Sequence, residues 1–223
     1  MDVIHRLAEE GAEVGTAVMA GEQLEGRGSR GRAWYSPPGG LWLSVLLRPP
    51  AASVEVISLR AGLAVAEAME LSSIRLELKW PNDLMLAGRK AGGVLCEARW
   101  QGDALGWTAV GIGMNVRNDI PSDLRSSAAS LMDIRPEITV EKVAEPVLRA
   151  LRSLDLGAAR LLPSEMRSFA ARDWLKGRRI REPLAGTVAG LGEDGSLLVR
   201  PAGGPEVAVR NGPVELAAVS HSR

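Results

Sequence analysis

The chain contains very few of the side chains that bind metals, form disulfides or act as thiol and imidazole catalysts. Its 223 residues include one cysteine, Cys96, and two histidines, His5 and His221. A single cysteine excludes an internal disulfide, and so small a donor set argues against a zinc site of standard composition. We expect Cys96, which lies in an apolar stretch, to be a small core residue. Because the opening residues lack a signal-peptide pattern, we expect a cytoplasmic protein.

The chain also lacks an excess of charge of either sign, and it lacks long hydrophobic runs. Its 27 lysines and arginines balance 27 aspartates and glutamates, which removes the general electrostatic attraction to nucleic acids and anionic membranes. An apolar stretch such as residues 41–47 is interrupted by Ser44 and falls far short of the roughly 20 residues that cross a bilayer. We therefore expect neither a nucleic acid nor a membrane as a main partner.

The sequence pattern predicts helices combined with consecutive strands. Helices are expected over residues 1–10 and 53–71, the second capped by Ser53, and again near Thr139 and after Pro163. Strands are expected over residues 16–20, 42–47, 74–80, 92–99 and 105–113. We place Gly88 in the turn between the third and fourth of these strands. Consecutive strands favour an α+β fold with a mixed or antiparallel sheet, and the later helices should cover one sheet face.

The last part of the chain has a different character. Short β-runs there are separated by turn signals at Gly186, Asp194-Gly195, Gly203-Gly204 and Gly212-Pro213. We place a boundary at about Gly177, which gives domains over residues 1–176 and 177–223. The second is expected to be a small β-barrel or sandwich that leans on the first, because it is near the lower size limit for independent stability.

The first candidate site is a loop rich in glycine and arginine, GRGSRGR, at residues 26–32. Its cations lie on a backbone that the glycines make permissive, so it can close around an anion. The loop also matches the G-x-G-x-x-G pattern of dinucleotide-binding folds, but residues 33–40 cannot begin the helix on which a pyrophosphate would sit. A solvated basic loop is the alternative. Trp34 and Trp42, beside the loop, could stack on a bound ring.

The second candidate is the segment KWPND at residues 79–83, at the end of an apolar strand. Pro81 ends the strand, so Lys79, Asn82 and Asp83 are presented together. The alternative is structural: Lys79 and Asp83 form a surface ion pair, and Asn82 serves the turn.

Two further segments place a polar side chain at the end of an apolar strand. In GRKAGG, residues 88–93, Lys90 precedes a strand whose glycines allow a ligand to approach the backbone closely. In GIGMNV, residues 111–116, Asn115 ends a strand of apolar residues and glycine. A bulge with an exposed lysine and an ordinary strand end are the alternatives.

Together, in this order and spacing, the four segments resemble the biotin protein ligase family. The resemblance extends to residues 172–178, RDWLKGR, and to the later glycine hairpins, and so covers almost the whole chain. It implies a biotin/lipoate ligase fold, like that of class II aminoacyl-tRNA synthetases, with a small C-terminal SH3-like β-barrel. It also implies an ATP-dependent ligase that makes biotinyl-5'-AMP and then transfers biotin to a lysine of a biotin carboxyl carrier protein, an acetyl-CoA carboxylase subunit or similar enzyme.

The resemblance also implies roles for individual residues. The residues expected to bind biotin are Gln23, Arg27, Gly28, Ser29, Lys90 and Gly93. Those expected to bind ATP or the adenylate are Arg30, Arg32, Trp34, Lys79, Asn82, Asp83 and Asn115. Arg27, Lys79 and Lys90 would be catalytic, because cations neutralise the charge that grows when a carboxylate attacks a phosphate. We expect no cluster of protein metal ligands, and Mg²⁺ should arrive with ATP, near Asp83.

The chain departs from the family pattern at two places. Ser29 stands where the family commonly has an arginine associated with retention of the activated biotin. A strand and a Ser-Thr pair precede the family position occupied here by Met1, so we expect the natural protein to begin upstream. We also expect no operator-binding domain and no transcriptional repression.

Three other functions stay open at this point. A lipoate or octanoyl ligase would share the fold, and a non-catalytic remnant would bind biotin without releasing pyrophosphate. A nucleic-acid-binding module would use the basic loop and would show steep salt dependence without a need for ATP. A homodimer also stays open.

Overall fold

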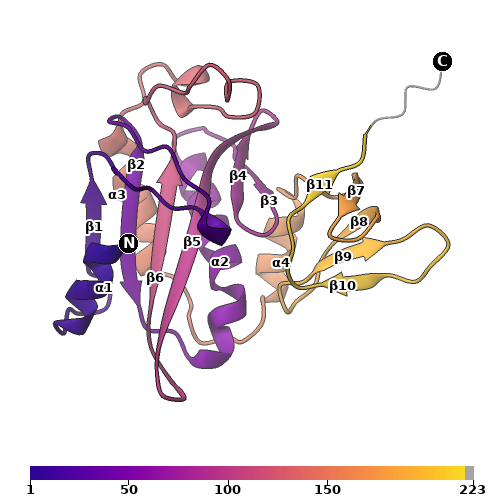
Figure 1. Cartoon of the computed structure of the whole chain (residues 1–223), viewed down its shortest axis with the longest axis horizontal. Coiled ribbons are helices and arrows are strands. Elements are labelled where there is room, and N and C mark those ends of the chain that lie inside the picture. The colour runs from indigo at the N-terminus through magenta and orange to yellow at the C-terminus, as the bar shows by residue number, and fades with distance from the viewer. Residues whose placement is uncertain (219–223) are drawn as a thin grey trace.

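The computed structural model, which describes residues 1–218, contains two sheets with helices packed around the larger one (Figure 1). Within those residues the larger sheet has the strand order β1-β2-β6-β5-β4-β3, and every neighbouring pair is antiparallel. Its strands are β1 (Ala17–Ala20), β2 (Leu41–Leu47), β3 (Glu77–Lys79), β4 (Asp83–Leu86), β5 (Arg89–Gln101) and β6 (Ala104–Met114). The expected combination of helices with an antiparallel sheet is confirmed.

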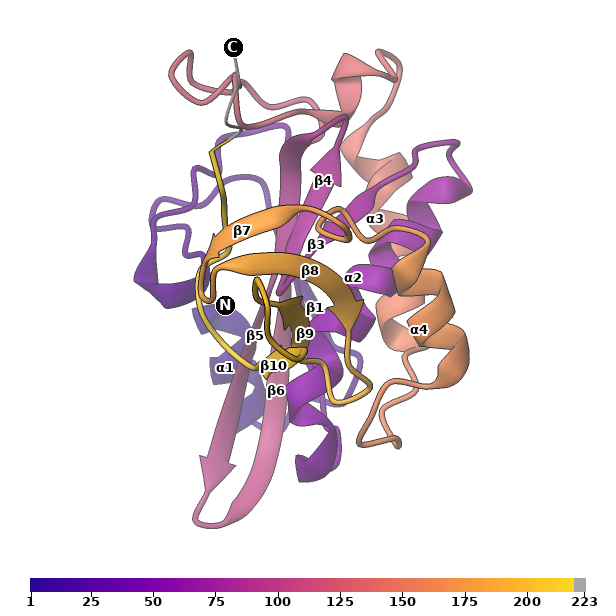
Figure 2. The same ribbon diagram turned by 90° about the vertical axis from the view of Figure 1, so that its right-hand side faces the viewer.

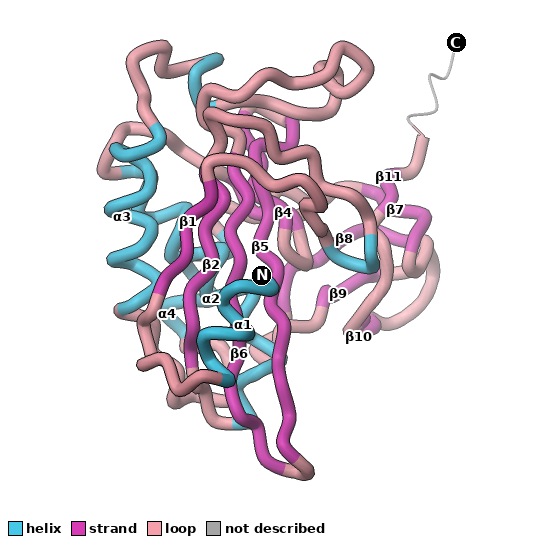
Figure 3. Tube along the Cα trace, turned by 60° about the vertical axis from the view of Figure 1, so that its left-hand side comes forward, coloured by secondary structure: helices cyan, strands magenta, loops and turns pink. Residues whose placement is uncertain are grey.

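Helices lie on both faces of this sheet (Figure 2). On one face α1 (Asp2–Glu9) packs Ile4 and Ala8 against Trp107 in a small cluster of its own. On the opposite face lie α2 (Val54–Glu70) and α3 (Val140–Arg152), which pack against each other, and α4 (Pro163–Ala170) lies beside α2 (Figure 3). On the face that carries α1, Met1 at the start of the helix reaches Ser44 of β2.

The expected helix caps differ in outcome. Thr139 caps α3 as predicted, since its Oγ1 accepts a hydrogen bond from the backbone N–H of Lys142 at 3.4 Å. Ser53 stands at the N-cap position of α2, but its hydroxyl donates to the carbonyl of Leu156 at 2.8 Å. The cap prediction for Ser53 is therefore wrong, because a buried carbonyl from a distant loop takes the hydroxyl.

The prediction for residues 74–93 needs correction. Of the single strand expected over residues 74–80, only Glu77–Lys79 forms β3. The chain reverses at Trp80-Pro81, and Asp83–Leu86 then returns as an unpredicted strand, β4, with Asp83 opposite Lys79. Gly88, with φ +77°, therefore joins β4 to β5 instead of β3 to β5. A four-residue strand of one aspartate and three apolar residues is too short for an alternating pattern to be recognised.

The smaller sheet lies at the C-terminal end of the described chain. Its strands are β7 (Arg179–Glu182), β8 (Gly186–Leu191), β9 (Leu197–Arg200), β10 (Val207–Val209) and β11 (Glu215–Leu216). The strand order is β10-β9-β8-β7-β11, and the sheet is open, since no pairing within residues 1–218 joins β10 to β11. The last residues of the expected second domain, 219–223 with His221, lie outside the described residues.

The two sheets share one hydrophobic core. Ile180 and Val199 of the smaller sheet belong to the same buried cluster as α2 and the larger sheet. Polar contacts reinforce the junction, because Trp80 Nε1 donates to the carbonyl of Gly195 at 2.9 Å and the Leu161 N–H donates to the carbonyl of Glu193 at 2.7 Å. Among the described residues, no helix is long and apolar enough to cross a membrane.

Candidate active site

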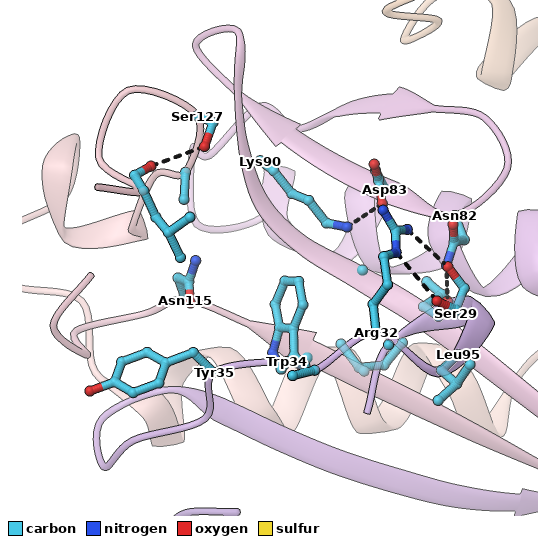
Figure 4. Close-up of a pocket in the computed structure, with 18 of the residues that line it drawn as sticks. Ser29, Arg32, Trp34, Tyr35, Asn82, Asp83, Lys90, Leu95, Asn115 and Ser127 are labelled. Atoms are coloured by element: carbon cyan, nitrogen blue, oxygen red, sulfur yellow. Dashed lines mark hydrogen bonds and ion pairs between the residues drawn. The ribbon is translucent and has the colours of Figure 1, made fainter. Parts of the chain in front are cut away.

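A cavity of about 660 Å³ lies between the glycine- and arginine-rich loop and strands β2, β4, β5 and β6 (Figure 4). Its volume is in the range of sites for small organic ligands. The structure places in its wall every residue expected to bind a ligand except Arg30. These residues are Gln23, Arg27, Gly28, Ser29, Arg32, Trp34, Lys79, Asn82, Asp83, Lys90, Gly93 and Asn115.

Arg30 does not line the cavity. Its backbone has φ +61° and the next residue, Gly31, has φ +70°. Two successive left-handed residues turn the chain back on itself, so that Arg32 returns to Ser29 while Arg30 is exposed. The structure therefore does not bring Arg30 together with the other candidate residues.

Lys90 lies at the centre of the polar wall. Its Nζ pairs with Asp83 Oδ1 at 2.5 Å and lies 5.0 Å from the centre of the Trp34 ring. Both side chains of the ion pair are largely shielded, with 29% and 17% of their surfaces exposed. Asp83 is thus bound to Lys90, and the ion pair between Lys79 and Asp83 considered from the sequence does not form.

Lys79 is the second cation of this wall. Burial lowers the pKa of its ammonium group, and the nearby Lys90 and Arg32 lower it further, while Asp83 and Glu215 act in the opposite direction. Its charged form is therefore less favoured than that of an ordinary lysine. A bound anion would raise the pKa of Lys79 again, because a nearby negative charge stabilises the ammonium form.

The two arginines of the loop that face the cavity are held by neighbouring side chains. The guanidinium of Arg27 binds both carboxylate oxygens of Asp2, and this hydrogen bond lowers the pKa of Asp2. The guanidinium of Arg32 donates to Ser29, to its hydroxyl at 3.2 Å and to its carbonyl at 3.4 Å. Both arginines are thus tied to exposed partners that an anionic ligand can displace.

The amide and indole groups of the wall support the backbone around the cavity. Asn82 donates to the carbonyl of Val94 at 2.6 Å, and Asn115 donates to the carbonyl of Ala129 at 3.2 Å. Trp34 Nε1 is buried with no hydrogen-bond partner among residues 1–218, and it packs on Gly113, where an added Cβ would lie 2.8 Å from it. Trp42, a candidate for stacking, is instead buried at 2% exposure and donates to the carbonyl of Pro37.

Several residues of the wall were missed from the sequence. Residues 118–121, Leu124 and residues 126–128 fold back over the cavity after β6. The backbone pairs Lys90 with this segment, since the Lys90 N–H donates to the carbonyl of Ser127 at 2.8 Å. The position of this segment shortly after Asn115 was the one signal in the sequence that it could lie near the site. The signal was not sufficient, because the path of a loop depends on contacts with residues far away in the sequence.

The opposite end of the cavity is apolar. Met1 and Leu95 line it together with Ser44, whose hydroxyl donates to Met1 Sδ at 3.2 Å. Ser44 was recognised only as an interruption of an apolar run. A hydroxyl in the middle of an otherwise apolar strand was the signal that this strand faces a cavity.

Comparison with known proteins agrees with this arrangement. Residues 3–115 match the biotin/lipoate A/B protein ligase family. The chain is similar to a biotin--[acetyl-CoA-carboxylase] ligase of Paracoccus denitrificans, with 30% identity over 215 residues, which are 85% of this chain and 86% of that protein. It is also similar to the bifunctional ligase/repressor BirA of Bacillus subtilis, with 39% identity over 134 residues, which are 57% of this chain but only 41% of that protein.

A solved structure is similar over almost the whole length. The biotin protein ligase of Aquifex aeolicus in complex with biotin and ATP superposes with a TM-score of 0.79 and 29% identity, over 96% of this chain and 94% of that chain. The sequence match, the fold and the composition of the cavity agree with one another. The chain belongs to the biotin/lipoate A/B protein ligase family.

Proposed function

We propose that the protein is an ATP-dependent biotin protein ligase. It would form biotinyl-5'-AMP from biotin and ATP and transfer the biotin to a lysine of a biotin carboxyl carrier protein, an acetyl-CoA carboxylase subunit or similar protein. The observation that carries the proposal is a single cavity with an apolar end at Met1 and Leu95 and a cationic wall at Lys79 and Lys90. This division suits a ligand with an apolar ring system and a carboxylate that must meet a phosphate.

The first half-reaction brings two anions together. The biotin carboxylate attacks the α-phosphorus of ATP, an acyl phosphate bond forms, and pyrophosphate leaves. Lys90 and Arg27, which line the cavity, would neutralise the carboxylate, and Lys79 and Arg32 would neutralise the phosphates. These cations would stabilise the charge that develops on the phosphate oxygens.

The second half-reaction needs no nucleophile from the enzyme. The amine of the carrier lysine attacks the acyl carbonyl of the mixed anhydride, an amide forms, and AMP leaves as a stabilised anion. The one cysteine is unsuited to this role, because burial raises the pKa of the Cys96 thiol to about 12.

We assign the remaining residues of the wall by their positions. Gln23, Gly28, Ser29 and Gly93 lie on the side of the loop and β5 and would contact biotin. Trp34, Asn82, Asp83 and Asn115 would surround the adenylate. Arg30, outside the cavity, could reach a phosphate only if the loop rearranged.

Mg²⁺ fits this site as an ion that ATP carries in. Asp83 lines the cavity and uses Oδ1 for Lys90, which leaves its second carboxylate oxygen for the metal. A single protein carboxylate is typical of Mg²⁺ that is held mainly by substrate phosphates, and the metal would supply further positive charge there.

The proposed function also implies a division of the chain into two domains. We infer a catalytic domain over residues 1–176 and an SH3-like β-domain over residues 177–223, supported by the separate five-stranded sheet of residues 179–216. A protein that uses ATP and modifies carboxylase subunits would work in the cytoplasm. A measurement of its mass in solution would show whether it forms a homodimer.

Pyrophosphate release tests the proposed function. We expect release from ATP with biotin, and transfer of biotin to the lysine of an isolated carrier domain, detected by mass spectrometry. Lipoate and octanoate serve as matched acids with the same carboxylate but other carbon skeletons. Release with lipoate and none with biotin would contradict the assignment, and biotin binding without any release would identify a non-catalytic remnant.

The serine at position 29 leads to a prediction about how fast the biotinyl-adenylate escapes from the site. A serine offers only a neutral hydroxyl at this point of the wall, and it is already bonded to Arg32. A charge-assisted contact to the adenylate is worth about 1.5–3 kcal/mol, so Ser29→Arg should slow its escape about tenfold or more. Modification of lysines on a bystander protein should fall accordingly in the variant, and equal labelling by both proteins would show Ser29 to be neutral for retention.

A further inference from the structure

One cation of the cavity is held by an aromatic ring instead of a carboxylate. Lys79 Nζ lies 5.5 Å from the centre of the Trp174 ring. Among the residues that the structure describes, no ion pair engages Lys79, because Asp83, opposite it in the β3–β4 hairpin, is paired with Lys90. The face of an indole ring attracts an ammonium group at this distance.

The ring of Trp174 is itself fixed in place. It is 9% exposed and lines the cavity. On the ring lies the guanidinium of Arg178, 4.1 Å from its centre, and Arg178 Nε donates to the Trp174 carbonyl at 2.5 Å. The backbone N–H of Trp174 donates to the carbonyl of Leu78, the residue before Lys79, at 3.0 Å. The ring therefore keeps a constant position relative to the backbone that carries Lys79.

The surroundings of Lys79 explain why such support matters. Burial and the neighbouring Lys90 and Arg32 lower the pKa of Lys79, and the carboxylates of Asp83 and Glu215 only oppose this. A neutral amine would lose its attraction for a phosphate. The indole face favours the charged form, since it interacts with the cation and not with the amine.

We propose that Trp174 is a positioning residue that holds the Lys79 ammonium group in the wall of the cavity where the ATP phosphates bind. The contact to the phosphates rests on the proposed function, whereas the contact between ring and ammonium does not. The role also connects the active site to the smaller sheet, because the carbonyl of Arg178, four residues after Trp174, accepts a hydrogen bond from the backbone N–H of Val188 in β8.

The chain offers a direct test, because it has only four lysines, Lys79, Lys90, Lys142 and Lys176. Reductive methylation with ¹³C-formaldehyde keeps their charge and gives each a separate NMR signal, and Lys79→Arg assigns the one of interest. We expect the ring current of Trp174 to shift the Lys79 methyl signal upfield of the exposed Lys142 signal in the native protein. An unshifted Lys79 signal would overturn the proposal without any variant of Trp174.

Two substitutions isolate the aromatic face. Trp174→Phe and Trp174→Leu both vacate the space of the second indole ring, but only phenylalanine keeps a π face. The Lys79 methyl signal should therefore stay upfield of the Lys142 signal in the phenylalanine variant and lose that shift in the leucine variant. Identical Lys79 methyl signals in the two folded variants would contradict the proposal.

The kinetic arm uses the same pair of variants. In Trp174→Leu the KM for ATP should rise about three- to tenfold, with less change in kcat and in the KM for biotin, and Trp174→Phe should recover part of the loss. Trp100→Leu is the control, because Trp100 is 52% exposed on β5 and does not line the cavity. An unchanged KM for ATP alongside the expected NMR shifts would overturn the positioning role, whereas a native protein that releases no pyrophosphate would contradict the proposed function instead.

Discussion

Replacing Lys90 by alanine is expected to slow pyrophosphate release with biotin and ATP by a factor on the order of 10²–10³, as for other groups that stabilise developing charge. Lys90 lies at the centre of the polar wall, between Asp83 at 2.5 Å and the Trp34 ring at 5.0 Å. Without it, the carboxylate of biotin and the phosphate would approach each other beside an unpaired Asp83. Single-turnover measurement of pyrophosphate would report this step separately from transfer to the carrier.

Two controls separate the charge of Lys90 from other effects. Lys142→Ala removes an exposed lysine from α3 that does not line the cavity, and it should leave the rate unchanged. The double variant Lys90→Ala with Asp83→Asn removes both charges of the pair. If the double variant recovered the native rate, the loss in Lys90→Ala would come from the exposed carboxylate of Asp83, and a native rate in Lys90→Ala itself would remove Lys90 from the reaction.

Replacing Arg60 by alanine is expected to lower the free energy of unfolding by about 3 kcal/mol, at the low end for breaking a buried ion pair. Arg60 on α2 is 2% exposed, and its guanidinium binds Glu165 at 2.8 Å and the carbonyls of Ala158 and Arg160 at 2.6 Å. Its loss would leave a largely shielded carboxylate, 19% exposed, and two carbonyls without their donor. Urea unfolding followed by circular dichroism measures the difference.

Arg149→Ala is the matched control for Arg60. Arg149 on α3 pairs with Glu145 one helical turn away, and both side chains are exposed, at 70% and 74%. Because solvent screens such a pair, its loss should cost less than about 0.5 kcal/mol. Losses of equal size in the two variants would mean that the network around Arg60 adds nothing beyond an exposed ion pair.

Local patterns in the sequence were sufficient for most of the secondary structure. The helices at residues 1–10, 53–71 and after Thr139 and Pro163 appear as α1 to α4, because caps, proline at an early helical position and helical spacing act within a few residues. The motif segments are also local, and nearly all the residues chosen from them line the same cavity. Features that depend on neighbouring residues could therefore be predicted from the sequence.

The partners of those residues were decided only by the tertiary structure. Whether Asp83 pairs with Lys79 or with Lys90 depends on the register of β4 against β5, which a bulge between Leu84 and Met85 shifts. The approach of Trp174 to Lys79 joins residues 95 positions apart, through a backbone bridge between Leu78 and Asp173. Such contacts follow from the packing of whole elements, and no short segment carries that information. Short motifs were thus enough to indicate the family, the helices and the cationic residues of the site. The neighbour that holds each cation depends on distances that arise only when the chain is packed.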